Sequence, residues 1–187
     1  MSGEGTQDSA QIFATMKEFI DFGEQDVKNL VEMAPLMQKH QQRITDYFYE
    51  VLGKYPPTAK LIEGRIDQLK GTHAVWFGEL FAGDYSDAYF EGRWRIGMAH
   101  VRIGLDPYWV EAVMSVIRTM SLEALAQELD DAAAVAQKHA SLLKLLDIDL
   151  LIINLSYQED RLARLTDFTG MKRKLIENII RIPKKKD

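Results

Sequence analysis

Apolar residues along this chain of 187 residues recur at the spacing of helices rather than with the alternation of β-strands. Through most of the length they fall at positions i, i+3 and i+4, which lie on one face of an α-helix. Sustained alternation of β-branched with polar residues is missing from the sequence. The pattern therefore predicts an all-α protein.

Prolines and glycines divide this pattern into eight or so helices. We expect a loose leader to about residue 12 and helices over about 12–22, 24–33, 35–53, 58–64, 66–81, 86–104, 107–127 and 131–165. Pro35 should begin a helix after a turn, because proline suits the first helical turn, and Gly104 should end one in the left-handed conformation. A short amphipathic segment follows Thr169 and Gly170. The uneven helix lengths favour a globin-like packing around a pocket over an elongated bundle.

Composition agrees with one globular domain and excludes several kinds of chemistry. Hydrophobic residues at 47% and charged residues at 27% are typical of folded soluble proteins. A net charge of -5 offers no basic field for nucleic acid, although the end of the chain, RIPKKKD, is basic. The absence of cysteine excludes disulfides, thiol nucleophiles and zinc–thiolate sites. With neither a signal peptide nor a membrane span in the sequence, we expect a cytoplasmic protein.

His100 is the main candidate for chemistry, in the apolar run RIGMAHVRIGLDPYWVEAV. Gly97 and Gly104 flank it at helical spacing, which predicts clearance for a flat macrocycle against the helix. One neutral histidine is a common haem ligand, and Met98 and Ile103 offer apolar contacts. No second ligand lies at metal-site spacing, which disfavours a zinc or di-iron centre. A backbone carbonyl should accept from the second ring nitrogen. The alternative is an ordinary core or surface histidine.

The segment from Leu69 to Trp109, LKGTHAVWFGELFAGDYSDAYFEGRWRIGMAHVRIGLDPYW, resembles the globin domain of globin-coupled sensors, relatives of aerotaxis transducers and protoglobins. The motifs H-x-R-I-G-L-x-P-x-W and L-F-A-G carry the similarity, which extends more weakly from about Phe22 to Leu165. The resemblance implies a globin fold that binds haem b, with His100 as the proximal iron ligand. It implies a leader with a short helix at 1–22, a sensor globin domain at 23–165, and a short helix with a basic tail at 166–187.

The resemblance also implies which residues face the bound gas. The Phe48-Tyr49 pair and Thr72 should lie on that side, where a hydroxyl can donate a hydrogen bond to dioxygen. We expect Thr72 to point inward and His73 outward, because neighbouring helical residues differ by about 100° in direction. Iron ligation by His73 is an alternative, and Tyr49 and Thr72 could instead be ordinary core or back-bonded residues. The further haem contacts are expected from Leu69, Trp76, Met98, Ile103 and Gly104.

The segment SLLKLLDIDLLIINL, residues 141–155, is apolar around almost its whole circumference. A helix of that kind needs partners on more than one side. We expect one side to pack on its own core and a stripe of Leu146, Leu150 and Ile153 to pair with the same helix of a second chain, giving a dimeric four-helix bundle with the preceding helix. A central helix buried within a monomer is the alternative.

Three functional classes remain open. The resemblance favours a sensor that binds dioxygen, carbon monoxide or nitric oxide and passes the signal through a homodimer to an output domain or signalling protein. A haem enzyme acting on nitric oxide or peroxide is the second class, but no reductase-like region or distal acid–base pair supports it. A haem-free globin-like adaptor is the third, and His100 argues against it. The sequence therefore predicts a gas sensor rather than an enzyme.

Overall fold

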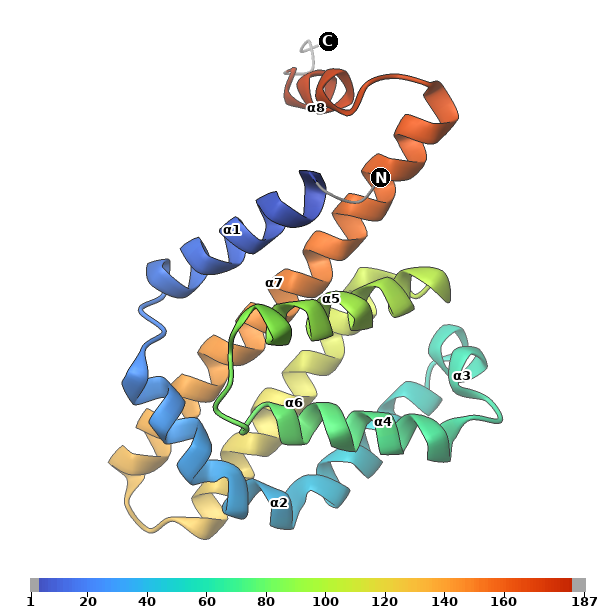
Figure 1. The fold of residues 1–187 in the computed structure, drawn as a ribbon. Coiled ribbons are helices and arrows are strands. Elements are labelled where there is room, and N and C mark those ends of the chain that lie inside the picture. Colours follow the sequence, from blue (N-terminus) through green and yellow to red (C-terminus); the bar gives the residue numbers. More distant parts are fainter. Residues whose placement is uncertain (1–3, 183–187) are drawn as a thin grey trace, which may run out of the picture.

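The structure, a computed structural model, describes the backbone of residues 4–182 and the side chains of residues 11–182. Eight α-helices and no strands make up this part of the chain (Figure 1). They are α1 (Glu4–Phe19), α2 (Glu24–Gly53), α3 (Pro56–Ile62), α4 (Ile66–Glu79), α5 (Asp87–Arg102), α6 (Pro107–Glu128), α7 (Ala132–Thr169) and α8 (Arg173–Arg181). The prediction of an all-α protein is confirmed.

Helix α7 is the central element of the fold. It contacts α1, α2, α5, α6 and α8, and Figure 1 shows it running diagonally through the molecule. Leu146 and Ile153, two members of the stripe expected to pair with a second chain, are buried inside this one. These two residues already pack within one chain, whereas Leu150, the third member of the stripe, is only partly buried. Pairing of two chains stays a prediction.

Helix α2 contains the main error in the predicted helix boundaries. It continues from Glu24 to Gly53 with Pro35 inside it, where we expected a turn. Proline lacks the N–H of a helical hydrogen bond and clashes with the carbonyl four residues earlier, so it bends the helix, and the ribbon of α2 changes direction part-way along (Figure 1). Met33 and Met37, on either side, are completely buried. Burial of two such side chains, at about 1.5 to 3 kcal/mol each, outweighs the roughly 3 kcal/mol that the proline costs.

Other boundaries differ by less. Helix α1 begins at Glu4 rather than near residue 12, and α3 begins at Pro56, because a proline fits the first helical position. Helix α7 reaches Thr169, beyond the expected end at 165, and stops where Gly170 adopts a left-handed φ of 68°. None of the helices within the described residues is both long enough and apolar enough to cross a bilayer.

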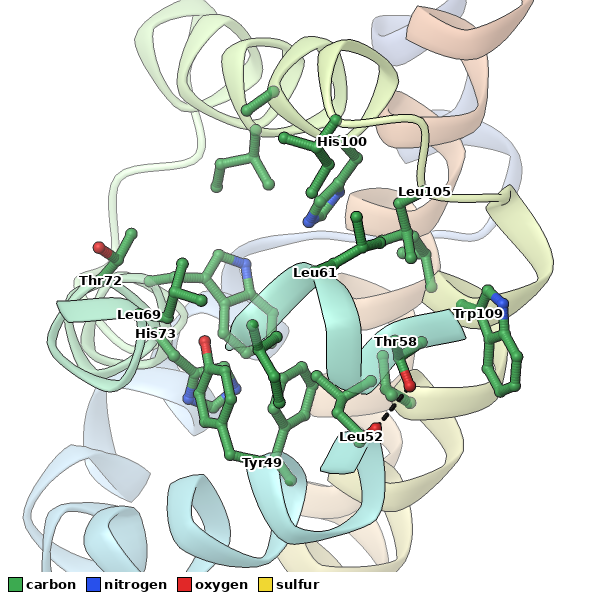
Figure 2. Close-up of a pocket in the computed structure, with 18 of the residues that line it drawn as sticks. Tyr49, Leu52, Thr58, Leu61, Leu69, Thr72, His73, His100, Leu105 and Trp109 are labelled. Atoms are coloured by element: carbon green, nitrogen blue, oxygen red, sulfur yellow. Dashed lines mark hydrogen bonds between the residues drawn. The ribbon is translucent and has the colours of Figure 1, made fainter. Parts of the chain in front are cut away.

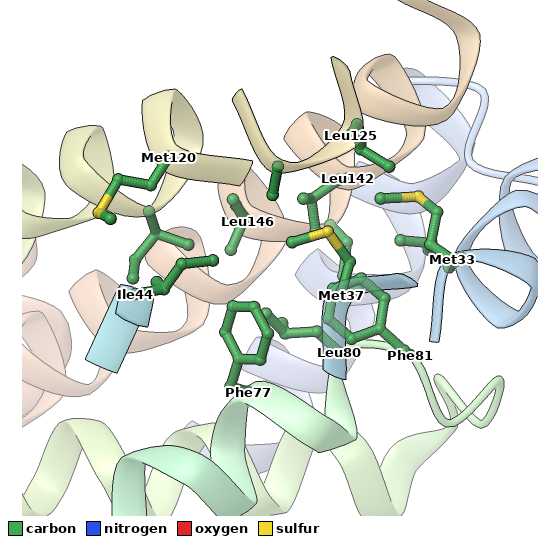
Figure 3. Close-up of a cluster of buried hydrophobic side chains, with 14 of the residues drawn as sticks. Met33, Met37, Ile44, Phe77, Leu80, Phe81, Met120, Leu125, Leu142 and Leu146 are labelled. Atoms are coloured by element: carbon green, nitrogen blue, oxygen red, sulfur yellow. The ribbon is translucent and has the colours of Figure 1, made fainter. Parts of the chain in front are cut away.

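The hydrophobic core joins α2, α4, α6 and α7. Figure 3 shows side chains from these helices meeting, and its fully or nearly fully buried members include Met37, Phe77, Leu125, Leu142 and Leu146. Met114 and Ile117 of α6 belong to this core and also line a cavity beside it. The core therefore holds in place the helices that carry the candidate site.

Candidate functional site

A cavity of about 300 Å³ opens between α2, α3, α4, α5 and α6, and Ile153 of α7 also lines it. Its walls are mainly aliphatic and aromatic, as in many small-molecule sites. Figure 2 shows His100 reaching into this space from α5, with Tyr49 and His73 on the opposite side. The fold therefore brings residues far apart in the sequence around one apolar space.

Most of the residues predicted to contact a haem line this cavity. They are Phe48, Tyr49, Leu69, Thr72, Trp76, His100 and Ile103. Met98 and Gly104 are absent from its lining. Met98 lies two residues before His100 on α5, a rotation of about 200°, so it points away from the cavity. Gly104 follows Ile103, the C-cap residue of α5, and has no side chain to contribute.

The two glycines beside His100 have roles that differ from the predicted clearance. A β-carbon at Gly97 would lie 2.1 Å from Ser156 Oγ and 3.1 Å from the Cα atom of Ile153, so Gly97 allows α5 to pack closely against α7. Gly104 has φ 70°, and the next N–H donates to the His100 carbonyl at 3.1 Å, which closes the end of α5. The predicted clearance for a macrocycle is therefore wrong at Gly97, which faces α7. At Gly104 the left-handed backbone conformation is enough to explain a glycine.

His100 remains the strongest candidate ligand on other grounds. Burial lowers the pKa of its imidazole to about 4, so the ring is neutral at neutral pH and can offer a lone pair. Its Nδ1 atom is buried and has no hydrogen-bond partner within residues 11–182. The predicted backbone acceptor for this nitrogen is therefore not found, and a buried polar atom without a partner is costly.

The prediction that His73 points outward is wrong, whereas Thr72 lines the cavity as predicted but is exposed. His73 is buried, and its Nδ1 atom lies 3.0 Å from Thr45 Oγ1. The centroid of its ring lies 4.5 Å from the centroid of the Phe48 ring. The Nε2 atom of His73 is buried without a partner in the described part of the chain. Thr72 is exposed, and its hydroxyl donates to the carbonyl of Gln68 at 3.2 Å. The aromatic neighbours of the imidazole ring therefore favour the inward position for His73.

Burial also lowers the pKa of His73 to about 4, so the cavity has two neutral imidazoles. Tyr49 lies near His73, with ring centroids 6.0 Å apart, and burial raises the pKa of its phenol to about 12. The phenol therefore keeps its proton at neutral pH. Its hydroxyl makes no hydrogen bond to any other described residue, and Figure 2 shows it directed towards the cavity. It is a free donor in an apolar space.

A buried ion pair next to the cavity was missed by the sequence analysis. Asp149 of α7 is fully buried and accepts from Arg93 Nε at 2.8 Å, from the Tyr89 hydroxyl at 2.5 Å and from Trp76 Nε1 at 2.9 Å. Arg93 also pairs with Glu79 of α4. These contacts join α4, α5 and α7 and hold the Trp76 indole in the cavity wall. The signal available in the sequence was a single aspartate within the apolar run DLLIINL.

The wall formed by α3 and the start of α4 was also missed. Thr58, Leu61 and Ile62 line the cavity from α3, and Arg65 lines it from the residue before α4. Helical spacing of the apolar residues in α3 could have predicted one inward face. In the described residues, no three histidine, aspartate or glutamate side chains gather as a protein-only metal centre.

Comparisons with known proteins agree on one family. The sequence model of the family Protoglobin matches residues 9–163. The heme-based aerotactic transducer HemAT of Halobacterium salinarum is 28% identical over 172 residues, a match that covers 86% of this chain and 35% of the transducer. The chain therefore spans about a third of the length of that relative.

Solved structures show the same relationship. The globin domain of the Geobacter sulfurreducens globin-coupled sensor matches with a TM-score of 0.74 and 34% identity, over 77% of this chain and 96% of that domain. The ferric globin domain of E. coli DosC matches with a TM-score of 0.63 over 79% of this chain and 98% of that domain, and at 18% identity this likeness concerns the fold alone. The predicted globin fold is confirmed. The extent of the family match, together with a 34% identical relative that the chain covers almost completely, shows that the chain belongs to the protoglobin family.

Proposed function

We propose that this chain binds haem b in the cavity through His100 and senses a diatomic gas, with dioxygen as the expected ligand and carbon monoxide or nitric oxide as others. The observation that carries the proposal is a half-buried, neutral histidine that lines an apolar cavity. The names of the relatives, a heme-based aerotactic transducer and a globin-coupled sensor, support it. Those names describe signalling proteins, so they favour a sensor over a haem enzyme or a haem-free adaptor.

The residues around the cavity fit a haem group. The walls are apolar, and the polar atoms without partners among the described residues include His100 Nδ1 and His73 Nε2. Iron held in the porphyrin would supply the affinity for a diatomic gas, which no side chain of the chain offers. The neutral imidazole of His100 would hold that iron from the α5 side.

The chain's own residues would set the polarity of the gas site. Tyr49 can donate a hydrogen bond to a gas ligand that carries partial negative charge, as dioxygen does. Phe48 and Trp76 exclude water from the same wall, which strengthens such a bond. Thr72 stays a weaker candidate donor, because its hydroxyl already bonds to its own helix.

A resting state in which His73 also binds the iron is a second candidate. The supporting observation is the buried Nε2 atom of His73, which has no partner within the described residues. If the Thr45 hydroxyl accepts from Nδ1, the Nε2 lone pair is free to bind a metal. In that state a gas ligand and His73 would compete for the same coordination site on the iron.

We also propose that ligation is signalled through α7 to a second copy of the chain or to an output protein. Gly97 fits against Ile153 and Ser156, and Arg93 is paired to Asp149, so α5 is fixed to α7 at two successive turns. A shift of α5 would therefore also displace α7. Pairing of two chains through α6 and α7, and residence in the cytoplasm, are part of the same proposal.

Absorption spectra of the purified chain loaded with haem test this function. We expect a stoichiometric complex whose oxidised, reduced and carbon monoxide spectra are those of a histidine-ligated globin. A five-coordinate ferrous spectrum would favour His100 alone, and a six-coordinate one would favour the participation of His73. Failure to take up haem in a saturable way would contradict the proposal.

A further inference from the structure

Arg65 holds a distinctive position at the rim of the cavity. It is the residue before α4, it lines the cavity, and it is also exposed to solvent. Among the described residues that line the cavity, Arg65 alone carries a charge at neutral pH. The remaining polar groups are hydroxyls, indoles and two imidazoles that burial keeps neutral.

The guanidinium of Arg65 is free to bind a ligand. Within residues 11–182 it forms neither an ion pair nor a side-chain hydrogen bond, although Glu63 and Asp67 flank it in the sequence. Other arginines of the fold, such as Arg93 and Arg173, are paired with carboxylates. Arg65 therefore stands at the edge of an apolar space, and its guanidinium has no acidic partner among the described side chains.

The backbone of Arg65 is held on both sides. Its N–H donates to the carbonyl of Ile62 at 3.1 Å, and its carbonyl accepts from the N–H of Leu69 at 3.0 Å. The first bond ties it to the end of α3 and the second to the first turn of α4. The side chain therefore starts from a fixed point between two helices that both line the cavity.

We propose that Arg65 binds a carboxylate of the cofactor and thereby fixes which edge of it faces the corner between α3 and α4. The inference rests on the proposed function. Haem is apolar over most of its surface and carries two carboxylates on one edge, so an apolar cavity with one cation at its rim matches this distribution of charge. A guanidinium is suited to the task because it can donate two parallel hydrogen bonds to a carboxylate.

The test compares haem with its dimethyl ester, in which both carboxylates are blocked. The wild type and Arg65→Ala are loaded with each ligand, and the rate of ligand transfer to an excess of an apoglobin acceptor is followed by absorption. We expect Arg65→Ala to lose haem about twofold to fivefold faster, the range for a solvent-exposed ion pair. With the dimethyl ester, wild type and variant should lose the ligand at the same rate.

Two further variants make the comparison specific. Arg65→Lys keeps the charge and should retain part of the wild-type rate, whereas Arg102→Ala removes an exposed cation that does not line the cavity and should change nothing. Equal rates of haem loss from the wild type and Arg65→Ala, or the same acceleration with both ligands, would overturn the proposed role of Arg65. Either result would leave the proposed function of the chain standing. A wild type that takes up neither ligand would overturn the proposed function together with it.

Discussion

Arg93 and His100 both lie on α5 and differ in whether their buried polar atoms have hydrogen-bond partners. On α5, Arg93 is paired with Asp149 and Glu79, and only its Nη2 atom lacks a partner in the described residues. His100 is two turns further along α5, yet its ring makes no hydrogen bond within the same residues. Arg93 is buried and His100 is half-buried with a buried Nδ1 atom, so the two differ mainly in whether the chain itself supplies the partners.

This difference separates a structural cluster from a binding site. A buried polar atom without a partner costs about 1 to 3 kcal/mol, so a fold retains one only where something else compensates. In the ion-pair cluster the protein compensates itself, because Asp149 accepts from three side chains. In the cavity, a bound ligand can compensate for the missing partner. Removing a paired group should therefore damage the fold, whereas removing an unpaired one should damage binding.

The largest effect is expected at His100. His100→Ala should abolish stoichiometric haem binding, because no other imidazole reaches the cavity from α5. The haem-free variant should be less stable than the haem-free wild type by no more than about 1 kcal/mol, since the ring satisfies no partner. Haem titration and urea unfolding measure the two effects. His139→Ala is the control, because His139 bonds to the Arg118 carbonyl outside the cavity and should leave haem binding unchanged. A normal haem spectrum in His100→Ala would contradict the assignment.

The next largest effect is expected from breaking the ion pair. Asp149→Ala leaves the guanidinium of Arg93 buried without its main partner, and such a change lowers the free energy of unfolding by about 3 to 5 kcal/mol. Asp147→Ala is a matched control on the same helix, because Asp147 is exposed and pairs with Arg118 near the surface. It should lower the free energy of unfolding by less than about 1 kcal/mol. Urea denaturation of the haem-free proteins distinguishes the two, and equal losses would show that the cluster is not a structural anchor.

The same comparison explains what the sequence could and could not predict. The helices followed from periodicity, the cavity position of His100 from its motif, and the inclusion of Tyr49 from the family resemblance. The inward position of His73 could not be predicted, because the rotation of α4 about its axis depends on its packing against α2. Periodicity fixes the spacing of a helical face but not which neighbour the face meets.

Gly97 and Asp149 illustrate a second limit. Both lie in segments whose helical structure was predicted correctly, yet their roles depend on a different helix: Gly97 on Ser156 of α7, and Asp149 on side chains of α4 and α5. The continuity of α2 through Pro35 is similar, since it depends on the burial of side chains on both sides of the proline. Local preferences were overridden in each case by contacts between elements distant in the sequence.

A smaller effect is expected from the unpaired phenol. Tyr49→Phe removes a free donor while keeping the ring, and a hydrogen bond to a partly charged acceptor contributes about 1.5 to 3 kcal/mol. Dioxygen should therefore dissociate on the order of tenfold to a hundredfold faster, with carbon monoxide affected less. Stopped-flow dissociation measures both rates. Tyr47→Phe, an exposed tyrosine on the same helix, is the control and should behave as the wild type. A dissociation rate within about twofold of the wild type would make Tyr49 an ordinary core aromatic.

The smallest effect is expected at Thr72, where the comparison between paired and unpaired groups gives its finest test. Thr72 lines the cavity but is exposed, and its hydroxyl donates to the Gln68 carbonyl, so it counts as a paired group. Thr72→Val keeps the shape of the side chain and should change dioxygen dissociation by less than about twofold, or about 0.4 kcal/mol. Thr119→Val removes a similar back-bonded hydroxyl away from the cavity and serves as the control. If Thr72→Val instead accelerated dissociation tenfold while Thr119→Val did not, the hydroxyl would have to turn from its own helix to the ligand. In that outcome a hydrogen bond within the protein would not exclude a side chain from the binding site, and the distinction drawn from Arg93 and His100 would hold only for buried polar atoms.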